Sequence, residues 1–464
     1  MCTQTSSHKL SSNDSPLAKQ PIDKLFLTLA LPMIFGMLLN GLHNLVDTYV
    51  VSQFIGSQAM AAVAIAFPIQ MCVLAIATMI NNGASILMSQ ALGANNHSEK
   101  SLVIFTAIKL SVLISTAIAV GYYIFSSSML EILRVPKELE SQVHQYFFPL
   151  MLGNMSIFTV ALFCDFFRAS GKVDKLFILI LVNALTNLVL DLLFVIGFDM
   201  GVRGAALATL GSHLLTCLVG LRFIPFNLAS QAEIRKKAMT LDFGMAKKIA
   251  QFGTPTLLQY SGAAIVIGIV NFLLSNAKPV NASDWLSAYG IICRLNVFVI
   301  LPLIAMTHAI QTIVSFNHGL GNYTRVKHAV KLGLRVCFLY LTCLWGLLLL
   351  LPEPLIGIFS DERTVVELAA RVSKMMYFLL PLASISMVAS AYLQGINRPT
   401  WAIFVTLFKI YILIIPCLYV LELSLGYQQL WYAFPAADLL VVLIVAFVFF
   451  RLEHDSTQQW TTAK

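Results

Sequence analysis

Charged side chains are scarce in this sequence. Asp, Glu, Lys and Arg make up 11% of the 464 residues, against 58% hydrophobic residues, and the mean hydropathy is +0.82. Soluble globular proteins carry about 25% charged residues. The shortage of charge therefore excludes a soluble domain and indicates an all-α polytopic membrane protein. The net charge of +8 comes from basic residues in short loops, where it sets membrane orientation and gives no reason to expect a nucleic-acid partner.

Cysteine clusters and catalytic motifs are absent from the sequence. All cysteines but Cys2 lie inside apolar runs, and no CxxC or Cys/His cluster occurs, which argues against disulfides and a zinc site. HExxH, GxSxG and GxxxxGK[ST] patterns are also missing, so we expect no enzyme activity and no cofactor. Residues 1–23 are polar and the apolar run after them is too long for a signal peptide, so we expect a cytoplasmic tail there.

Twelve apolar runs are long enough to cross a bilayer. They lie at about 25–52, 58–92, 99–126, 142–168, 174–198, 202–224, 247–275, 284–320, 327–351, 366–395, 400–424 and 429–451. Lys and Arg concentrate in both termini and in the loops after the even-numbered runs. By the positive-inside rule both termini are then cytoplasmic. Short loops and the lack of targeting segments suggest a bacterial cytoplasmic membrane.

The two halves of the chain resemble each other. Three ordered segments recur at a nearly constant separation: IDKLFLTLALPMIFGM matches AKKIAQFGTPTLLQYS, SQALGANNHSEKSL matches FNHGLGNYTRVKHA, and FFRASGKVDK matches YLQGINRPTW. These matches pair Pro32 with Pro255 and Gly93 with Gly321. Each half holds six spans, so the halves relate by an axis along the membrane normal.

The repeat predicts two pseudo-symmetric six-helix lobes around a central cavity. The expected segments are an N-terminal tail (1–23), an N-terminal lobe (24–224), a cytoplasmic linker (225–246), a C-terminal lobe (247–452) and a C-terminal tail (453–464).

The first apolar run carries a single acidic residue, Asp47. Asn40, His43, Asn44 and Asp47 recur at spacings of three and four, which places them on one helical face, and Pro32 interrupts the first half of the run. A carboxylate in a membrane helix costs roughly 2.5–3.5 kcal/mol on insertion scales, so it usually marks a functional site. The alternative is that Asp47 lies near the helix end and reaches the lipid headgroups.

The fifth apolar run carries a polar stripe. Asn183, Asn187 and Asp191 are spaced by four, and the sixth run places Thr209 on a face of small residues that lets helices approach closely. The second half has no carboxylate at the positions of Asp47 and Asp191. Two carboxylates repel in one low-dielectric cavity, so this pair would hold one proton or one Na⁺ with amide and hydroxyl oxygens. For the two asparagines, the alternative is interhelical hydrogen bonding without transport chemistry.

Other polar residues in the apolar runs give weaker signals. Asp165 precedes Arg168 by three residues, and the two are expected to pair at the cytoplasmic edge. The second half contains polar candidates that either form a structural network or contact a substrate: Gln259, Tyr260, Arg294, Gln311, Lys409 and Asp438. We favour the structural role for the three charged ones.

Several segments together resemble the multidrug and toxic compound extrusion (MATE) family, closer to its DinF-like or MepA-like prokaryotic branch than to its NorM-like one. They are LALPMIFGMLLNGLHNLVDTYVVSQFIG, SQALGAN, FFRASGK, VNALTNLVLDLLF, MGVRGAALAT, MTHAIQTIVSFNHGLGN and YLQGINRPT. The resemblance implies an antiporter that exports organic cations in exchange for Na⁺ or H⁺. It also implies a coupling-ion site in the first lobe at Asp47, Asn187, Asp191 and Thr209, and a bend of the first helix at Pro32. We expect the protein to be monomeric.

His43 departs from the family pattern, which has a tyrosine one turn before the first-span Asp. We hypothesise that His43 and Asp47 titrate as a coupled pair; the alternative is that His43 only replaces the phenol as a hydrogen-bond donor. A competing function within the superfamily is a flippase or exporter of a lipid-linked or other metabolite. The acidic residues of the first half favour cationic substrates instead.

Overall fold

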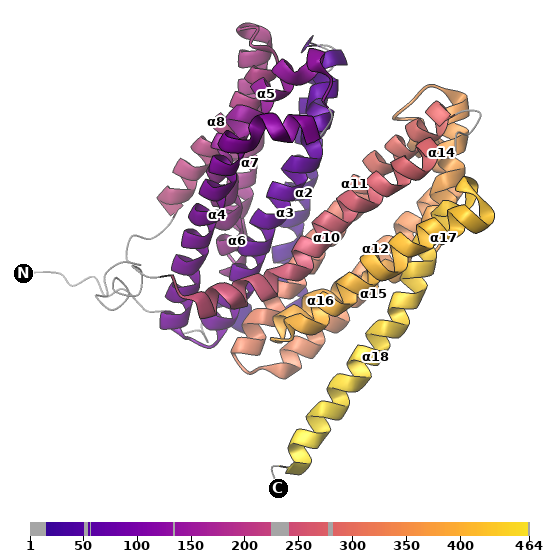
Figure 1. Cartoon of the computed structure of the whole chain (residues 1–464). Helices are drawn as coiled ribbons and strands as arrows, with labels where there is room; N and C mark the ends of the chain where they lie inside the picture. Colours follow the sequence, from indigo (N-terminus) through magenta and orange to yellow (C-terminus); the bar gives the residue numbers. More distant parts are fainter. Residues whose placement is uncertain are drawn as a thin grey trace, which may run out of the picture.

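The computed structural model describes residues 15–50, 54–55, 57–132, 135–223, 241–276 and 282–462. Within these ranges the chain is helical and has no strand. The ribbon forms two helical lobes that meet at one end of the molecule and separate toward the other (Figure 1). We call the end that carries the turns at 94–96 and 320–322 the convergent end.

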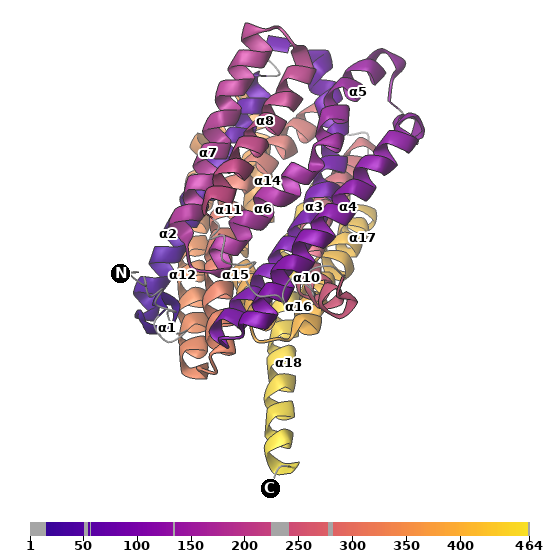
Figure 2. The same ribbon diagram turned by 90° about the vertical axis from the view of Figure 1, so that its left-hand side faces the viewer.

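The N-lobe follows a short helix, α1 (Pro16–Lys19), that lies at the convergent end. Its elements are α2 (Ile22–Val50), α3 (Ser57–Gly93), α4 (His97–Ile132), α5 (Lys137–Leu152), α6 (Asn154–Ala169), α7 (Val173–Asp191) with the π-helical segment η3 (Leu192–Gly197), and α8 (Gly201–Phe223). Figure 2 shows these helices in front of the C-lobe.

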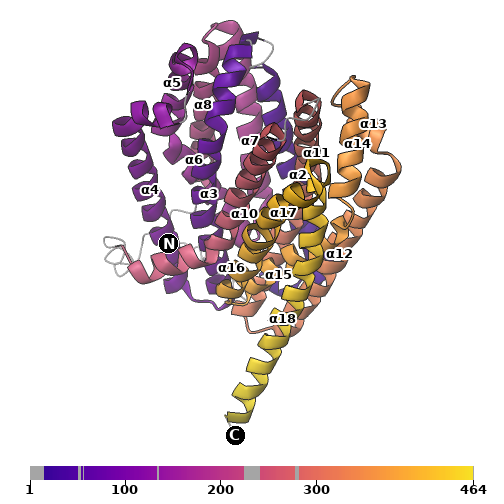
Figure 3. The ribbon, with the colours of Figure 1, turned by 45° about the vertical axis from the view of Figure 1, so that its right-hand side comes forward.

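The C-lobe repeats this order with more interruptions. Its elements are α10 (Phe243–Asn276), α11 (Ala282–Gly319), α12 (Tyr323–Leu350), α13 (Pro352–Ile356), α14 (Arg363–Met376), η5 (Leu380–Leu382), α15 (Ala383–Gly395), α16 (Pro399–Leu407), the π-helical η6 (Phe408–Ile414), α17 (Ile415–Leu425), η7 (Tyr427–Tyr432) and α18 (Ala433–Thr462). Helix α18 continues past the rest of the bundle at the convergent end (Figure 3).

Ten helices in the described ranges are long and apolar enough to cross a bilayer, and two bent helix pairs bring the number to twelve. The bent pairs are α5–α6, with an angle of 49°, and α14–α15, with an angle of 51°. Gly153 separates the first pair, and Pro381 lies at the break in the second. The predicted fold class is confirmed, and the fourth and tenth spans are broken where glycine or proline interrupts the helix.

The first helix of each lobe begins against the other lobe. Met245, Ile249 and Phe252, at the start of α10, belong to the hydrophobic core of the N-lobe, and α10 crosses between the lobes in Figure 3. Likewise Leu25 and Phe26 of α2 belong to the core that surrounds α11. The predicted boundaries at 24 and 247 therefore divide the sequence into repeats, but the packing exchanges the first turns of each repeat.

The ends of the equivalent helices show the register of the repeat. Helices α3 and α11 end at Gly93 and Gly319, and each is followed two residues later by a residue with positive φ, Asn95 (54°) and Gly321 (76°). The sequence alignment that pairs Gly93 with Gly321 is therefore two residues out of register. The alignment paired the last residue of α3, Gly93, with the glycine in the turn after α11. The turn after α3 has Asn95 at that position instead, because asparagine also tolerates the left-handed conformation.

The predicted N-terminal tail is partly ordered. Residues 1–14 lie outside the described ranges, but Leu17 is 2% exposed and packs beneath the lobes. Its carbonyl oxygen and that of Gln20 accept hydrogen bonds from Nη2 of Arg325, at 3.2 and 2.7 Å. The tail prediction was wrong for residues 15–23, because Leu17 is buried and the half-buried Arg325 holds the backbone at Leu17 and Gln20. At the other end of the chain, α18 extends to Thr462, and most of the linker at 225–246 lies outside the described ranges.

Candidate transport site

Four of the predicted N-lobe residues lie together. When the Asn187 amide is oriented to satisfy its neighbours, Nδ2 donates to Oδ2 of Asp191 (2.7 Å) and to Nδ1 of His43 (3.2 Å). Its Oδ1 then accepts from the backbone N–H of Thr209 (3.1 Å). Asn187 is fully buried and Asp191 is 2% exposed. The structure thus joins α2, α7 and α8 through one amide, and we call these four residues the N-lobe cluster.

Small residues allow the helices of the N-lobe cluster to approach. Ala205, Ala206 and Ala208 of α8 are buried, and the Thr209 hydroxyl donates to the Ala205 carbonyl oxygen at 3.1 Å. Close approach of α7 and α8 brings amide and hydroxyl groups within hydrogen-bonding distance of each other.

Asn183 extends the polar stripe away from the N-lobe cluster. Its Oδ1 accepts from the Thr216 hydroxyl at 3.4 Å, which joins α7 to α8 one turn nearer the convergent end. This contact matches the structural alternative for Asn183. Asn40 is exposed on α2, and Pro32 lies inside the same helix, half-buried.

Two predicted residues have side chains that lie outside the described part of the structure. The side chains of Asn44 and Asp47 are not among the described ones, although their backbone belongs to α2. Asp47 follows His43 by one helical turn, so its Cα lies on the face that carries the N-lobe cluster.

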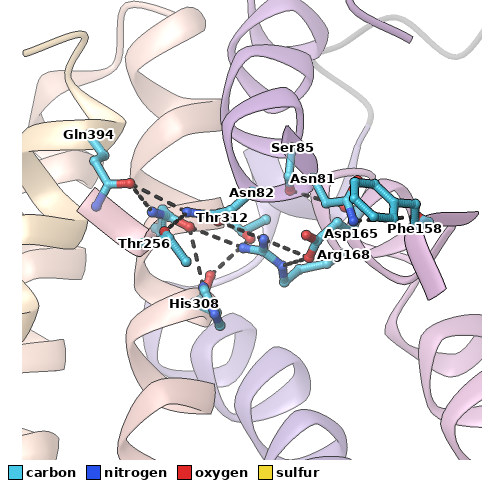
Figure 4. A network of polar contacts seen from close by, with 11 residues as sticks. Asn81, Asn82, Ser85, Phe158, Asp165, Arg168, Thr256, His308, Thr312 and Gln394 are labelled. Atoms are coloured by element: carbon cyan, nitrogen blue, oxygen red, sulfur yellow. Dashed lines mark hydrogen bonds and ion pairs between the residues drawn. The ribbon is translucent and has the colours of Figure 1, made fainter. Parts of the chain in front are cut away.

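A second polar network lies between the lobes (Figure 4), and the sequence predicted only its Asp165–Arg168 pair. Arg168 of α6 donates to Oδ1 of Asp165 (2.8 Å) and of Asn82 (2.9 Å) from Nη2, and to Oε1 of Gln311 (3.2 Å) from Nη1. Gln311 Nε2 in turn donates to Oε1 of Gln394 at 3.2 Å. Arg168 is 4% exposed. The Asp165–Arg168 pair is confirmed, but it lies buried at the lobe junction and not at the membrane edge.

Further bonds close this junction network. Asn82 Nδ2 donates to the Thr256 hydroxyl at 2.7 Å, and His308 Nδ1 lies 3.4 Å from Oε1 of Gln311. Arg168 and Gln394 are each the penultimate residue of their helices, α6 and α15. They therefore occupy equivalent positions of the repeat, and both are hydrogen-bonded to Gln311.

A cavity lies in the C-lobe and reaches the junction network. It has a volume of about 320 Å³, and Asn82, Thr256, Gln311 and Gln394 of the junction network line one part of it. Of the predicted second-half candidates, four line this cavity: Gln259, Gln311, Lys409 and Asp438. Tyr260 and Arg294 do not line it, and Arg294 is exposed on α11. The grouping of Arg294 with Lys409 and Asp438 was wrong, because Arg294 lies on another face of its helix.

No group of three or more His, Cys, Asp or Glu side chains in the described part of the chain is arranged to hold a metal ion. The N-lobe cluster offers one described carboxylate, at Asp191, and the Asn187 oxygen is already used by an N–H group.

Two membrane-spanning lobes, a cavity and buried polar clusters define a multi-pass membrane transporter. The family model MatE matches residues 32–193 and 246–420, and the chain belongs to this family of multidrug efflux transporters. Relatives include the probable multidrug resistance protein YoeA of Bacillus subtilis, 22% identical over 427 residues (89% of this chain and 90% of the relative). The multidrug export protein MepA of Staphylococcus aureus is 21% identical over 440 residues (95% and 96%).

A third relative is the FAD transporter of Shewanella oneidensis, 22% identical over 432 residues (92% of this chain and 94% of the relative). Among solved structures, a crystal structure of MATE in complex with MaL6 has a TM-score of 0.86 at 20% identity and covers 96% of this chain and 99% of its own. An outward-facing multidrug resistance MATE family transporter of the MOP superfamily has the same TM-score and identity, with coverage of 95% and 98%.

Proposed function

We propose that this protein is a secondary-active antiporter that exports amphipathic organic cations in exchange for protons. The observation that carries the proposal is the N-lobe cluster: a buried carboxylate at Asp191, hydrogen-bonded through Asn187 to His43. Ionisable groups inside a membrane bundle are expensive to bury and mark proton or ion pathways.

The chemical groups of the N-lobe cluster indicate which ion is coupled to export. Na⁺ is bound by oxygen ligands, and the Asn187 amide directs its N–H groups toward Asp191 and His43 while its oxygen accepts from Thr209. A carboxylate that accepts an N–H and lies near an imidazole is suited to gain and lose a proton. We therefore favour H⁺, with Na⁺ at Asp47, Asn187, Asp191 and Thr209 as the competing outcome.

Export proceeds by alternating access of the two lobes. The lobes meet at the convergent end, where the sequence places the basic loops and both termini, so this conformation is open to the extracytoplasmic side. Ion entry to the N-lobe cluster competes with the drug or reshapes α2 at Pro32, and the junction network must break for the cytoplasmic side to open. Because one chain contains both lobes and the cavity, a monomer in the bacterial cytoplasmic membrane is sufficient for transport.

The test is ethidium efflux from energised vesicles with a pH gradient or a Na⁺ gradient imposed separately. We expect the pH gradient to drive efflux, and we expect Asp191→Asn and Asp47→Asn proteins to lose it. Asp174→Asn is the matched control, because Asp174 is exposed on the same helix as Asp191. Wild-type efflux rates in both variants would overturn the proposed coupling site, and efflux driven only by Na⁺ would replace the proton.

Export of a metabolite is the second candidate, favoured by the relative named FAD transporter and by Lys409 in the C-lobe cavity. Efflux of a flavin nucleotide in the same vesicles distinguishes the two.

A further inference from the structure

An ion pair lines the C-lobe cavity. Lys409 Nζ lies 2.6 Å from Oδ1 of Asp438, and the two side chains are 19% and 12% exposed. Lys409 also donates to the Ser386 hydroxyl at 3.1 Å. The pair thus joins η6, α18 and α15, three elements of the same lobe.

Lobe stability gives no sufficient reason for this pair. Replacing a buried ion pair by apolar side chains of similar volume is often neutral or stabilising, because desolvation offsets the attraction between the charges. The remaining wall of the cavity is largely apolar, with Val266, Ile292 and Phe434 among its residues. Two opposite charges at the edge of an apolar, drug-sized cavity are typical of a binding site.

Local backbone geometry places Lys409 on this wall. It is the second residue of the π-helical segment η6, which ends two residues before Pro416. Proline has no N–H to donate and crowds the preceding turn, so the helix widens ahead of it. Such π segments occur frequently at functional sites.

The repeat shows that the charge is specific to the C-lobe. Lys409 is the eleventh residue from the start of α16, and the eleventh residue of α7 is Asn183. Asn183 makes a neutral hydrogen bond to Thr216. The N-lobe therefore combines a carboxylate with neutral partners, whereas the C-lobe combines one with an ammonium.

We propose that the Lys409–Asp438 pair is a substrate subsite for zwitterionic amphiphiles, which carry a carboxylate and a cationic nitrogen on an apolar or aromatic body. The ligand carboxylate replaces Asp438 as the partner of Lys409, which keeps its hydrogen bond to the Ser386 hydroxyl. The ligand cation pairs with Asp438, and the body lies against Val266 and Ile292. This subsite rests on the proposed export function, whose substrate class it extends.

Charge matching explains the selectivity. A purely cationic ligand that binds Asp438 leaves Lys409 without its carboxylate partner in a region of low dielectric, and such uncompensated buried charges are costly. A zwitterion exchanges one ion pair for two and leaves neither group unpaired. The cavity should therefore prefer a ligand with both charges over its ester.

The test uses rhodamine 110, a zwitterionic dye, and rhodamine 123, its cationic methyl ester. Binding to the full-length purified protein in nanodiscs is followed by fluorescence anisotropy at neutral pH. We expect wild-type protein to bind rhodamine 110 about tenfold more tightly than rhodamine 123, as one additional charge-assisted hydrogen bond provides. In K409M/D438N, which removes both charges together, the two affinities should become equal.

Arg294→Met is the matched control, because it removes an exposed cation of the same lobe and should keep the wild-type ratio. Equal wild-type affinities for the two dyes, or an unchanged ratio in K409M/D438N, would overturn the subsite. The ratio of the two dye affinities in wild-type protein tests the subsite even if K409M/D438N fails to fold. Dye binding requires no ion gradient. If wild-type protein shows the expected ratio of dye affinities but no dye efflux, the result contradicts the transport proposal and leaves the subsite intact.

Discussion

Gly93 and Gly319 contact each other's helices in the same way at the ends of α3 and α11. A Cβ on Gly93 would lie 2.0 Å from the carbonyl oxygen of Phe316, and a Cβ on Gly319 would lie 2.1 Å from that of Gln90. The two contacts are related by the pseudo-symmetry of the repeat. They place its axis between α3 and α11, where the backbones touch without intervening side chains.

The first prediction concerns this glycine contact. In Gly93→Ala the added methyl group forces α3 and α11 apart, because it meets backbone and not a movable side chain. Overpacking of this kind costs about 1–3 kcal/mol, so the population of the closed convergent end relative to the open one should fall by about fivefold or more. Dye efflux should fall, and a cysteine label near the turn at 94–96 should become more accessible.

Gly121→Ala is the control for this experiment. Gly121 lies in α4 and has open space where its Cβ would be, so the variant should transport like wild type. Normal efflux and labelling in Gly93→Ala would show that the lobes close without this contact.

The second prediction concerns Arg168. In Arg168→Met the oxygens of Asp165, Asn82 and Gln311 each lose a donor, and a buried group left unsatisfied costs about 1–3 kcal/mol. We expect a lower melting temperature in detergent together with weaker closure of the convergent end. Thermal unfolding and the cysteine labelling described above measure the two effects.

Arg168→Lys separates charge from geometry. A lysine keeps the positive charge, but its single ammonium lacks the planar fork that reaches three acceptors, so its stability should lie between those of wild type and Arg168→Met. A melting temperature for Arg168→Met equal to that of wild type would contradict the proposed junction.

The fold was largely predictable because its signals are local. Apolar runs predicted the twelve spans, since each span depends on composition over a single helix, and three short recurring segments predicted the two lobes. The exchange of the first turns of α2 and α10 was not predictable. It depends on contacts such as that between Gly253 and Met79, where a Cβ would lie 1.8 Å from a carbonyl oxygen, and these join distant parts of the chain.

The candidate site was predictable where one helix carried the pattern. The spacing of Asn187 and Asp191 on α7 was sufficient to place them together, and a polar residue on each neighbouring helix completed the N-lobe cluster. Arg168 was placed at the cytoplasmic edge of the membrane because basic residues near span ends usually set orientation. Its burial follows from the meeting of two lobes, and the only signal in the sequence was its position opposite Gln394 in the repeat.

The third prediction concerns His43. Its Nδ1 accepts from Asn187, which requires a neutral ring at that atom, and protonation adds a positive charge beside the N-lobe cluster. We expect ethidium to bind about tenfold more weakly at pH 5.5 than at pH 8 in wild type, as one unit charge nearby provides. His43→Tyr should show a flatter dependence, because a phenol does not titrate in this range.

His97→Tyr is the control, since His97 is exposed at the start of α4. Superimposable binding curves for wild type and His43→Tyr between pH 5.5 and 8 would exclude His43 from the titrating group.

The fourth prediction concerns Arg325, which holds the N-terminal helix α1 against the convergent end. Its guanidinium donates to Oδ1 of Asn317 (2.9 Å) and to the carbonyl oxygens of Leu17 and Gln20. In Arg325→Met these bonds are lost, and hydrogen bonds to charged groups contribute about 1.5–3 kcal/mol, so local release of α1 should increase at least about tenfold. Limited trypsin digestion should then cleave after Lys19 faster than in wild type.

Arg335→Met removes an exposed cation from the same helix and should leave the cleavage rate unchanged. Equal rates in all three proteins would mean that packing of Leu17 alone retains α1.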